Sequence, residues 1–284
     1  MSMKLLITLL FLAGAFQLRA QDTLRSQGYT VVWDTLRMKE KPEWKRHFDE
    51  AKVSSGTFVL FDQQRSKYFV YNRQRMVNRY LPASTFKIPH SLIALETAVV
   101  KSTSEKMKWD GFDKGNANWN MDQSMKSAFM YSTIWYYQEC AKKIGFKRMQ
   151  EYIDLMSYGN KNLHGGIDNF WLKGKLRISA KEQVDLLKKL QTDNLAFKPE
   201  VMKAVKEIMI EEENKIYILR AKTGWAEQDG KHIGWYVGYV EKPKKGKDAQ
   251  SDFWYFALNI DMDPNHPEMR KQIALRILSE VKAI

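Results

Sequence analysis

The chain has 284 residues, of which 44% are hydrophobic and 28% charged, enough to bury a sizeable core in one unit or two closely packed lobes. Its net charge is +13, but the positive residues are scattered and no nucleic-acid-binding motif accompanies them, which argues against a nucleic-acid partner. The single cysteine, Cys140, excludes an intrachain disulfide, and its helical surroundings predict a small buried hydrophobe rather than a nucleophile.

Residues 1–20 have the pattern of an export signal. Lys4 supplies a positive start, residues 5–16 are apolar and uncharged, and Ala20 offers a small residue for cleavage. The apolar stretch is shorter than the roughly 20 residues that a membrane span needs. We therefore expect a cleaved signal peptide, a soluble mature chain over 21–284 that forms one domain without a membrane span, and a periplasmic location. An uncleaved anchor or a buried terminal strand is the alternative.

Predicted strands lie toward the two ends of the chain, and predicted helices fill the middle. Runs rich in β-branched and aromatic residues indicate strands at 57–61, 68–71, 216–219, 235–240 and 253–258. Helical periodicity recurs at 149–156, 184–190 and 269–281, with Gly159 expected to terminate the first of these helices and a Ser179–Glu182 capping box expected to open the second. Residues 108–122 lack a clear period and predict a long loop. We expect an α+β fold in which one antiparallel sheet joins both ends of the chain and carries a helical lobe.

Ser84 and Lys87 are the first candidate pair for chemistry. If a helix begins near Ser84, the i,i+3 spacing puts both side chains on one face. A serine is a poor nucleophile until a neighbour takes its proton, and an apolar setting favours the neutral amine of Lys87. The same pattern at Ser279 and Lys282 warns that a lone match usually marks a solvated helix surface.

Ser132 and the Lys222-Thr223-Gly224 segment complete the pattern. Ser132 precedes a helical run, so it is either a proton relay or an ordinary helix cap. Lys222 and Thr223 can bind a carboxylate, and Gly224 allows close approach to the strand, unless the segment is merely a strand end with a glycine turn. The backbone N–H groups of Ser84 and Trp225 are candidates for an oxyanion hole.

The histidines provide no alternative chemistry. None of the five is spaced as a metal ligand, so no metal site is predicted, and no G-x-S-x-G motif is present. His90 follows Lys87 by three residues, and packing is its expected role. The residues thus favour an acyl-transfer site that works without histidine, of the kind that opens β-lactams or crosslinks peptidoglycan.

The chain resembles the class D serine β-lactamases (OXA-type) over essentially its whole mature length. The matching landmarks are Ser84-Thr85-Phe86-Lys87, Ser132-Thr133-Ile134, Tyr158-Gly159-Asn160, Phe170-Trp171-Leu172, Lys222-Thr223-Gly224 and Arg270. The resemblance implies the fold shared by serine β-lactamases and penicillin-binding proteins. It also implies hydrolysis of penicillin-type antibiotics through a Ser84 acyl-enzyme.

The resemblance further assigns roles to single residues. Lys87 would carry a carbamate formed from carbon dioxide or bicarbonate (N6-carboxylysine) and act as general base for acylation and deacylation, with no other cofactor. Trp171 would hold that carbamate, and Ser132 with Lys222 would pass a proton to the departing nitrogen. Substrate contacts would come from Thr223, Gly224, Trp225, Arg270, Ile134 and Leu172.

Two features leave alternatives open. The family's second motif usually ends in valine, and the extra methylene of Ile134 would crowd the carbamate or the path of the deacylating water. A β-lactam sensor or a DD-peptidase, each of which acylates without efficient turnover, and a structural envelope protein with a relic site are the competing functions. The sequence leaves the range of β-lactams and the choice between monomer and homodimer undecided.

Overall fold

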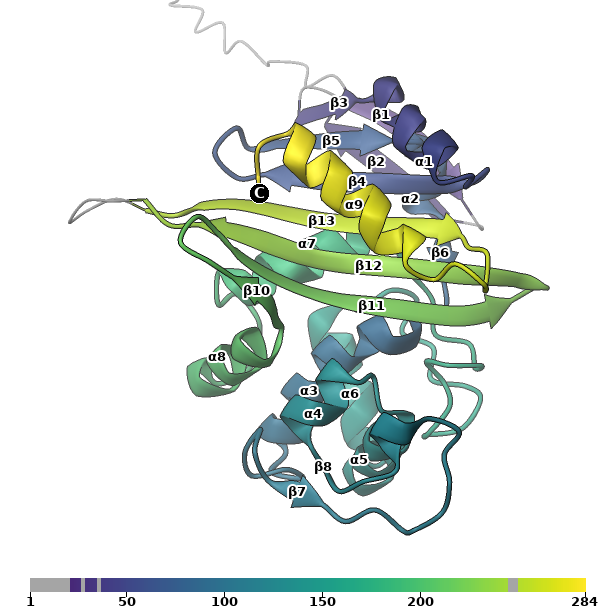
Figure 1. The fold of residues 1–284 in the computed structure, drawn as a ribbon, viewed down its shortest axis with the longest axis vertical. Helices are drawn as coiled ribbons and strands as arrows, with labels where there is room; N and C mark the ends of the chain where they lie inside the picture. Colours follow the sequence, from purple (N-terminus) through teal and green to yellow (C-terminus); the bar gives the residue numbers. More distant parts are fainter. Residues whose placement is uncertain (1–20, 27–28, 35–36, 245–249) are drawn as a thin grey trace, which may run out of the picture.

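A computed structural model describes residues 21–26, 29–34, 37–244 and 250–284 (Figure 1). The predicted signal peptide, residues 1–20, lies outside the described residues. The first described elements, β1 (Gln21–Ser26) and β2 (Tyr29–Asp34), pair with each other as a separate antiparallel hairpin that the sequence pattern did not predict.

A seven-stranded sheet forms the centre of the molecule. In spatial order its strands are β10 (Ile210–Glu213), β11 (Ile218–Gln228), β12 (Lys231–Lys242), β13 (Asp252–Asp261), β4 (Gly56–Asp62), β5 (Lys67–Tyr71) and β3 (Met38–Glu40). The expected joining of the two chain ends is confirmed, because the C-terminal strand β13 pairs with the N-terminal strand β4, with Ala257 opposite Val59.

The sheet differs from the prediction at one edge. Its strands are antiparallel except β3, which runs parallel to β5, so the sheet is mixed rather than wholly antiparallel. The physical reason is the connection. The chain leaves β3 through η2 (Pro42–Trp44) and α1 (Lys45–Glu50) before it enters β4, and no tight hairpin turn forces β3 to run antiparallel to its neighbour.

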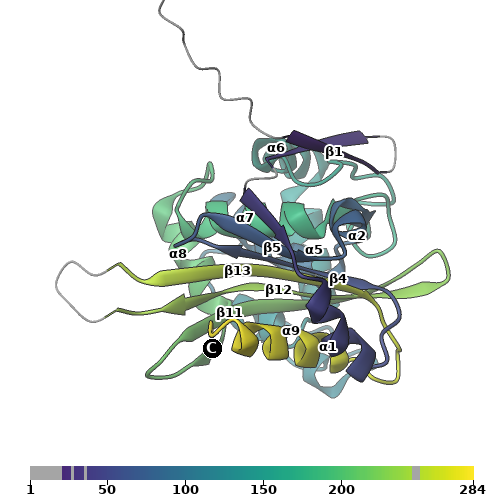
Figure 2. The ribbon, with the colours of Figure 1, turned by 90° about the horizontal axis from the view of Figure 1, so that it is seen from above.

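Helices cover both faces of the sheet (Figure 2). On one face lie α1 and α9 (Met269–Glu280). The other face carries α2 (Arg73–Val77) and α7 (Ala180–Gln191), beyond which the helical lobe follows. The helices of that lobe are α3 (Lys87–Glu96), α4 (Met125–Met130), α5 (Ile134–Ile144), α6 (Phe146–Met156) and α8 (Pro199–Ile208).

Strand β4 shows why its sequence is continuously apolar. Successive side chains of a strand point to opposite faces of the sheet. Phe58 and Leu60 belong to the core beneath α1 and α9, whereas Val59 and Phe61 belong to the core shared with α7 and the helical lobe. Both faces of β4 are therefore buried, so apolar residues do not alternate with polar ones along this strand.

The helix ends agree with the sequence in one case and differ in another. The capping box is confirmed, because the Ser179 side chain accepts from the backbone N–H of Glu182 and the Glu182 side chain accepts from that of Ser179. Gly159 does not end α6. Ser157 takes the left-handed conformation (φ 52°) directly after Met156, and Gly159 adopts its own positive φ two residues later.

The loop expected at 108–122 is confirmed. It connects β7 (Lys106–Met107) to β8 (Gln123–Ser124) and contains only the short turn η4 (Ala117–Trp119). The indole of Trp119 donates to the carbonyl of Tyr131 at 2.9 Å, so the loop is fixed to the backbone immediately before Ser132.

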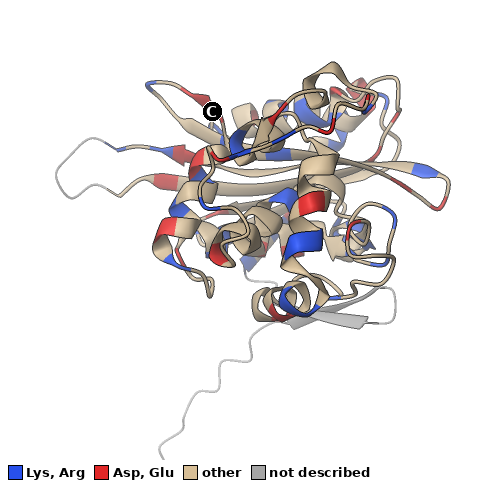
Figure 3. Cartoon of the chain, turned by 90° about the horizontal axis from the view of Figure 1, so that it is seen from below, with Lys and Arg blue, Asp and Glu red and all other residues tan. Residues whose placement is uncertain are grey.

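Charged residues are interspersed over the fold. Figure 3 shows Lys and Arg alongside Asp and Glu on the same elements. Within the described residues, no helix combines the length and apolar character needed to cross a membrane.

Candidate active site

Ser84 and Lys87 lie side by side where a short helical turn becomes α3. Ser84 belongs to η3 (Ala83–Phe86), and Lys87 is the first residue of α3. The Nζ of Lys87 is 3.1 Å from the Oγ of Ser84, within hydrogen-bond distance. Ala83, just before the serine, has a positive φ of 49°, and its N–H donates to the carbonyl of Trp171 at 3.0 Å. Backbone strain of this kind is common at functional sites.

The amine of Lys87 is buried beside an aromatic ring. It has no exposed surface and lies 5.1 Å from the ring centroid of Tyr137. Burial, aided by the positive charge of Lys222, holds the pKa of Lys87 well below its ordinary value. A neutral amine can accept a proton or attack an electrophile, which an ammonium cannot do.

Ser132 stands at the end of a second short connection, between α4 and α5. Its φ is 55°, and its Oγ lies 2.5 Å from the Nζ of Lys222. The alternative role as a helix cap is not observed, because Thr133 is the N-cap residue of α5 and caps it without a side-chain hydrogen bond. The positive φ instead aims Ser132 at β11.

Lys222 comes from the middle of β11, so Lys222-Thr223-Gly224 is strand interior and not a strand end with a glycine turn. Burial lowers the pKa of Lys222 to about 7, and the charge of Arg270 acts in the same direction. Strand β10 pairs only with Ile218–Arg220, so β11 is an open sheet edge from Lys222 onward. That edge provides backbone groups for an extended ligand.

Gly224 lies at a close contact between η3 and β11. A Cβ at this position would lie 3.0 Å from Thr85 Cγ2, 3.1 Å from the Pro82 carbonyl and 3.2 Å from Trp235 Cβ. The missing side chain therefore lets the serine-bearing turn η3 pack against β11. The predicted contact of Gly224 with substrate stays a prediction.

Arg270 reaches β11 from α9. Its Nη1 donates to the carbonyl of Gly224 at 2.8 Å, while its buried Nε has no partner among the described residues. The guanidinium thus lies beside Thr223 and Trp225 with part of its hydrogen-bonding capacity unused, as a carboxylate site requires.

Trp171 and its neighbours form the wall behind Ser84 and Lys87. The Trp171 ring is wholly buried, stacks on Phe86 at 5.8 Å and contacts Phe170 edge-on at 4.9 Å. Tyr158 contacts Phe86 edge-on at 5.4 Å, and its hydroxyl is buried and unpartnered within the described chain. Gly159 passes so close to the Arg177 carbonyl that a Cβ would lie 1.9 Å from it.

A cavity of about 470 Å³ opens where this wall meets β11. Its lining residues are Ile134, Leu172, Lys173, Trp225, Ala226, Glu227 and Asp229. The structure thus brings the predicted pocket residues Ile134, Leu172 and Trp225 to one opening.

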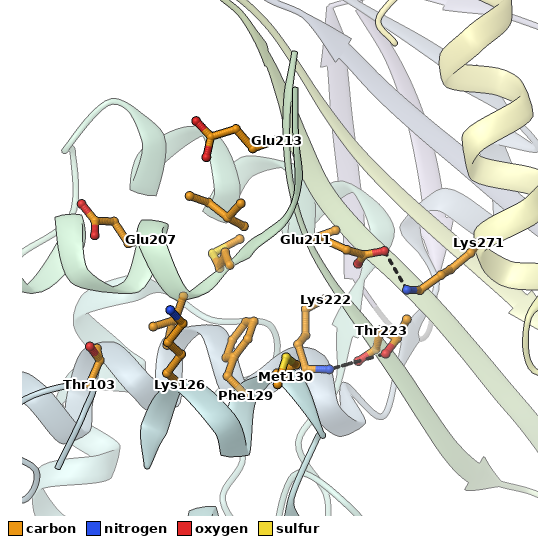
Figure 4. A pocket seen from close by; sticks show the side chains of 14 residues that line it. Thr103, Lys126, Phe129, Met130, Glu207, Glu211, Glu213, Lys222, Thr223 and Lys271 are labelled. Carbon is orange, nitrogen blue, oxygen red and sulfur yellow. Dashed lines mark hydrogen bonds and ion pairs between the residues drawn. The ribbon is translucent and has the colours of Figure 1, made fainter. Parts of the chain in front are cut away.

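A second cavity of about 550 Å³ has Lys222 and Thr223 in its lining (Figure 4). Phe129, Met130 and Met209 contribute apolar surface, and Glu211 pairs with Lys271 at 2.6 Å. Glu211 raises and Lys271 lowers the pKa of Lys222, in addition to the larger effects of burial and Arg270.

Several supporting residues were not predicted. Gln183 donates to the buried hydroxyl of Thr85 at 2.8 Å, and the backbone of Leu81 bonds both Trp235 and Gln228, at 2.9 and 2.8 Å. These contacts fix η3 from α7 and from the β11–β12 pair. Their sequence separations of 98 to 154 residues leave no local signal.

Comparisons with known proteins agree with this arrangement. The family model of the penicillin-binding protein transpeptidase domain matches residues 47–279. Beta-lactamase OXA-48 of Klebsiella pneumoniae is 40% identical over 87% of this chain and 90% of its own, and the probable beta-lactamase YbxI of Bacillus subtilis is 42% identical over 75% and 77%. The crystal structure of FUS-1 (OXA-85), a class D β-lactamase from Fusobacterium nucleatum, covers 87% of this chain and all of its own with a TM-score of 0.81 at 36% identity.

Proposed function

The chain belongs to the class D β-lactamases, and on that premise we propose that it hydrolyses penicillin-type β-lactams through an acyl-enzyme on Ser84. Members of this family are hydrolases that open the cyclic amide of a β-lactam. One observation carries the proposal: each of two serines lies within hydrogen-bond distance of a buried lysine, Ser84 with Lys87 and Ser132 with Lys222. That arrangement supplies a nucleophile, a base and a proton relay.

The site fits a carbamate on Lys87. A buried neutral amine is the form that combines with carbon dioxide, and the wholly buried indole of Trp171, which carries an N–H donor, belongs to the wall behind Lys87. When present, the carbamate supplies the base that takes the proton of Ser84 and later that of the hydrolytic water. Trp171 would hold it through that N–H.

The remaining residues each have one role in the reaction. The Oγ of Ser84 forms a bond to the lactam carbonyl carbon as its proton leaves for the base. The N–H groups of Ser84 and Trp225 hold the oxyanion. The ring C–N bond then breaks, and Ser132 passes its proton to the departing nitrogen and regains one from the base that took the proton of Ser84, while the amine of Lys222 holds the Ser132 hydroxyl by a hydrogen bond. Water next attacks the acyl carbon and releases Ser84.

Substrate binding uses the open edge of β11. Thr223 and Arg270 bind the substrate carboxylate, Arg270 through the part of its guanidinium that Gly224 leaves unused. Ile134, Leu172 and Trp225 receive the acyl side chain in the smaller cavity. Carbon dioxide or bicarbonate is the only small molecule required beside the substrate. We also propose export to the periplasm with removal of residues 1–20, as a monomer or homodimer.

The time course of a chromogenic penicillin in large excess, in bicarbonate buffer, tests the function. We expect sustained turnover far beyond one product per protein. Ser84→Ala should lose turnover by more than about a thousandfold, the scale on which enzymes lose rate without their nucleophile. Continued turnover by Ser84→Ala would remove Ser84 as the nucleophile.

Lys87→Ala separates the proposed base from the nucleophile. Since one base serves both steps, we expect this variant to acylate slowly and then remain acylated, which mass spectrometry of the intact protein detects. Rapid product release from Lys87→Ala would contradict a base role for Lys87. A burst of one equivalent followed by a plateau in the unmodified protein would instead favour a β-lactam sensor or a DD-peptidase.

A further inference from the structure

His90 is a buried imidazole next to Lys87 that the proposed chemistry does not use. It follows Lys87 by three residues on α3, so both side chains lie on one face of that helix. The residue has no exposed surface, and neither ring nitrogen has a hydrogen-bond partner among the described residues. Leaving a buried donor unpaired costs about 1–3 kcal/mol, so packing alone would be served better by phenylalanine.

The surroundings of His90 place its ring at the site. Its ring centroid lies 5.2 Å from that of Trp171, in an edge-on arrangement, and 5.1 Å from that of Tyr137. The Nζ of Lys87 lies 5.1 Å from the same Tyr137 ring. The amine of Lys87 and the imidazole of His90 therefore lie near the same Tyr137 ring, and the imidazole also contacts the indole of Trp171, so a group added to Lys87 would lie close to these rings.

We propose that His90 donates a hydrogen bond to a carbamate on Lys87 and is a positioning residue for it, an inference that rests on the proposed function. A carbamate has two oxygen atoms, and each accepts hydrogen bonds as a carboxylate does. Trp171 serves one oxygen and His90 the other. This interaction gives the unpaired imidazole nitrogen the partner that the unmodified chain does not supply.

The ionisation of His90 suits this role. Burial and the neighbouring Lys87 lower the pKa of His90 to about 3, so at neutral pH the imidazole is uncharged and carries one N–H donor.

The test measures the carbamate itself. The mature protein is titrated with ¹³C-bicarbonate, and the carbamate carbon is followed by NMR. In His90→Phe we expect the half-saturating bicarbonate concentration to rise about tenfold or more, the factor for losing one hydrogen bond to a charged group. For His90→Gln, which retains an N–H donor, the half-saturating bicarbonate concentration should rise less. His47→Phe is the matched control, because His47 is also buried but lies in α1 on the opposite face of the sheet.

Activity gives a second readout. If His90 acts by holding the carbamate, the turnover rate of His90→Phe should recover toward that of the unmodified protein as bicarbonate is raised. A carbamate signal with the same half-saturation in His90→Phe as in the unmodified protein overturns the role of His90 and leaves the proposed function intact. Absence of the signal from the unmodified protein overturns both.

A measurement on the unmodified protein covers the case in which His90→Phe does not fold. The ¹⁵N resonances of the His90 ring should shift when bicarbonate is added, because a carbamate oxygen becomes the partner of its N–H. Carbamate formation that leaves these resonances unchanged overturns the proposal.

Discussion

Lys222 is a buried amine whose burial costs free energy that depends on pH. Its side chain is 4% exposed, and its pKa is lowered to about 7 by burial first and by Arg270 second. In the unfolded chain a lysine titrates near 10.4. Between these values the unfolded chain binds a proton at Lys222 that the folded chain releases, so this residue makes stability rise with pH.

We expect Lys222→Met to stabilise the protein more at pH 7 than at pH 9. The unfolding free energy of the variant minus that of the unmodified protein should be larger at pH 7 by about 2 kcal/mol, since each pH unit in the window contributes up to ~1.4 kcal/mol. Urea unfolding at both pH values measures this difference. Titrating groups whose pKa Lys222 does not affect cancel in the comparison. A difference that is equal at the two pH values would contradict the lowered pKa.

Burial also explains why the sequence indicates catalysis for one of two serine and lysine pairs and not for the other. Ser84 with Lys87 and Ser279 with Lys282 share one spacing. The structure buries Lys87 completely, whereas Ser279 and Lys282 are exposed at the end of α9. The apolar neighbours of Ser84 predicted this difference. The unpaired nitrogens of His90 were not predictable, because they depend on rings from α5 and from the segment that holds Trp171.

At the scale of elements, the contact between η3 and β11 positions Ser84 relative to Lys222. Gly224 is the point of closest approach, where Thr85 and the Pro82 carbonyl fill the space of a side chain. Its φ is not in the left-handed region, so a substitution there acts through this contact and not through backbone strain.

Gly224→Ala should therefore raise the activation free energy of acylation by more than it lowers the free energy of unfolding. The added methyl pushes η3 away from β11, and a shift of a few tenths of an ångström to 1 Å at a nucleophile costs up to about a hundredfold in rate. Single-turnover acylation and urea unfolding measure the two effects. Gly230→Ala is the control, since a Cβ there meets nothing within 4 Å and only its φ of 72° is unfavourable. Equal losses of acylation in both variants would contradict the packing role.

Sequence patterns predicted the elements better than their edges. The apolar runs identified β4, β5, β12 and β13, and the Ser179–Glu182 box identified the start of α7, because these signals are local. The parallel pairing of β3 depends on a connection through η2 and α1, and the end of α6 at Ser157 depends on a non-glycine residue in a left-handed conformation. Neither has a signature in a short window of sequence.

At the scale of the molecule, the helical lobe and both ends of the chain pack against the same sheet. The core on the α7 side combines Val59 and Tyr255 of the sheet with Tyr137 and Leu187 of the helices. On the other face, Glu280 of α9 binds η2 and α1: it accepts from Trp44 of η2 at 3.2 Å and from Arg46 of α1 at 2.8 Å, and lies 2.7 Å from His47. The single domain predicted over 21–284 therefore implies one cooperative unfolding transition.

We expect far-UV circular dichroism and tryptophan fluorescence to give the same urea midpoint for the unmodified protein. Glu280→Gln should lower that midpoint, and the two signals should still coincide. Burial alone would raise the pKa of Glu280, but its bonds to His47 and Arg46 outweigh burial and lower it. The carboxylate therefore stabilises the fold at neutral pH, by about 1–2 kcal/mol for a partly exposed site. This contribution is lost as pH falls below about 4, so the variant and the unmodified protein should converge there. Gln272→Glu, an exposed substitution on the same helix, is the charge control. Two separate midpoints in the unmodified protein would mean that the lobe folds independently of the sheet.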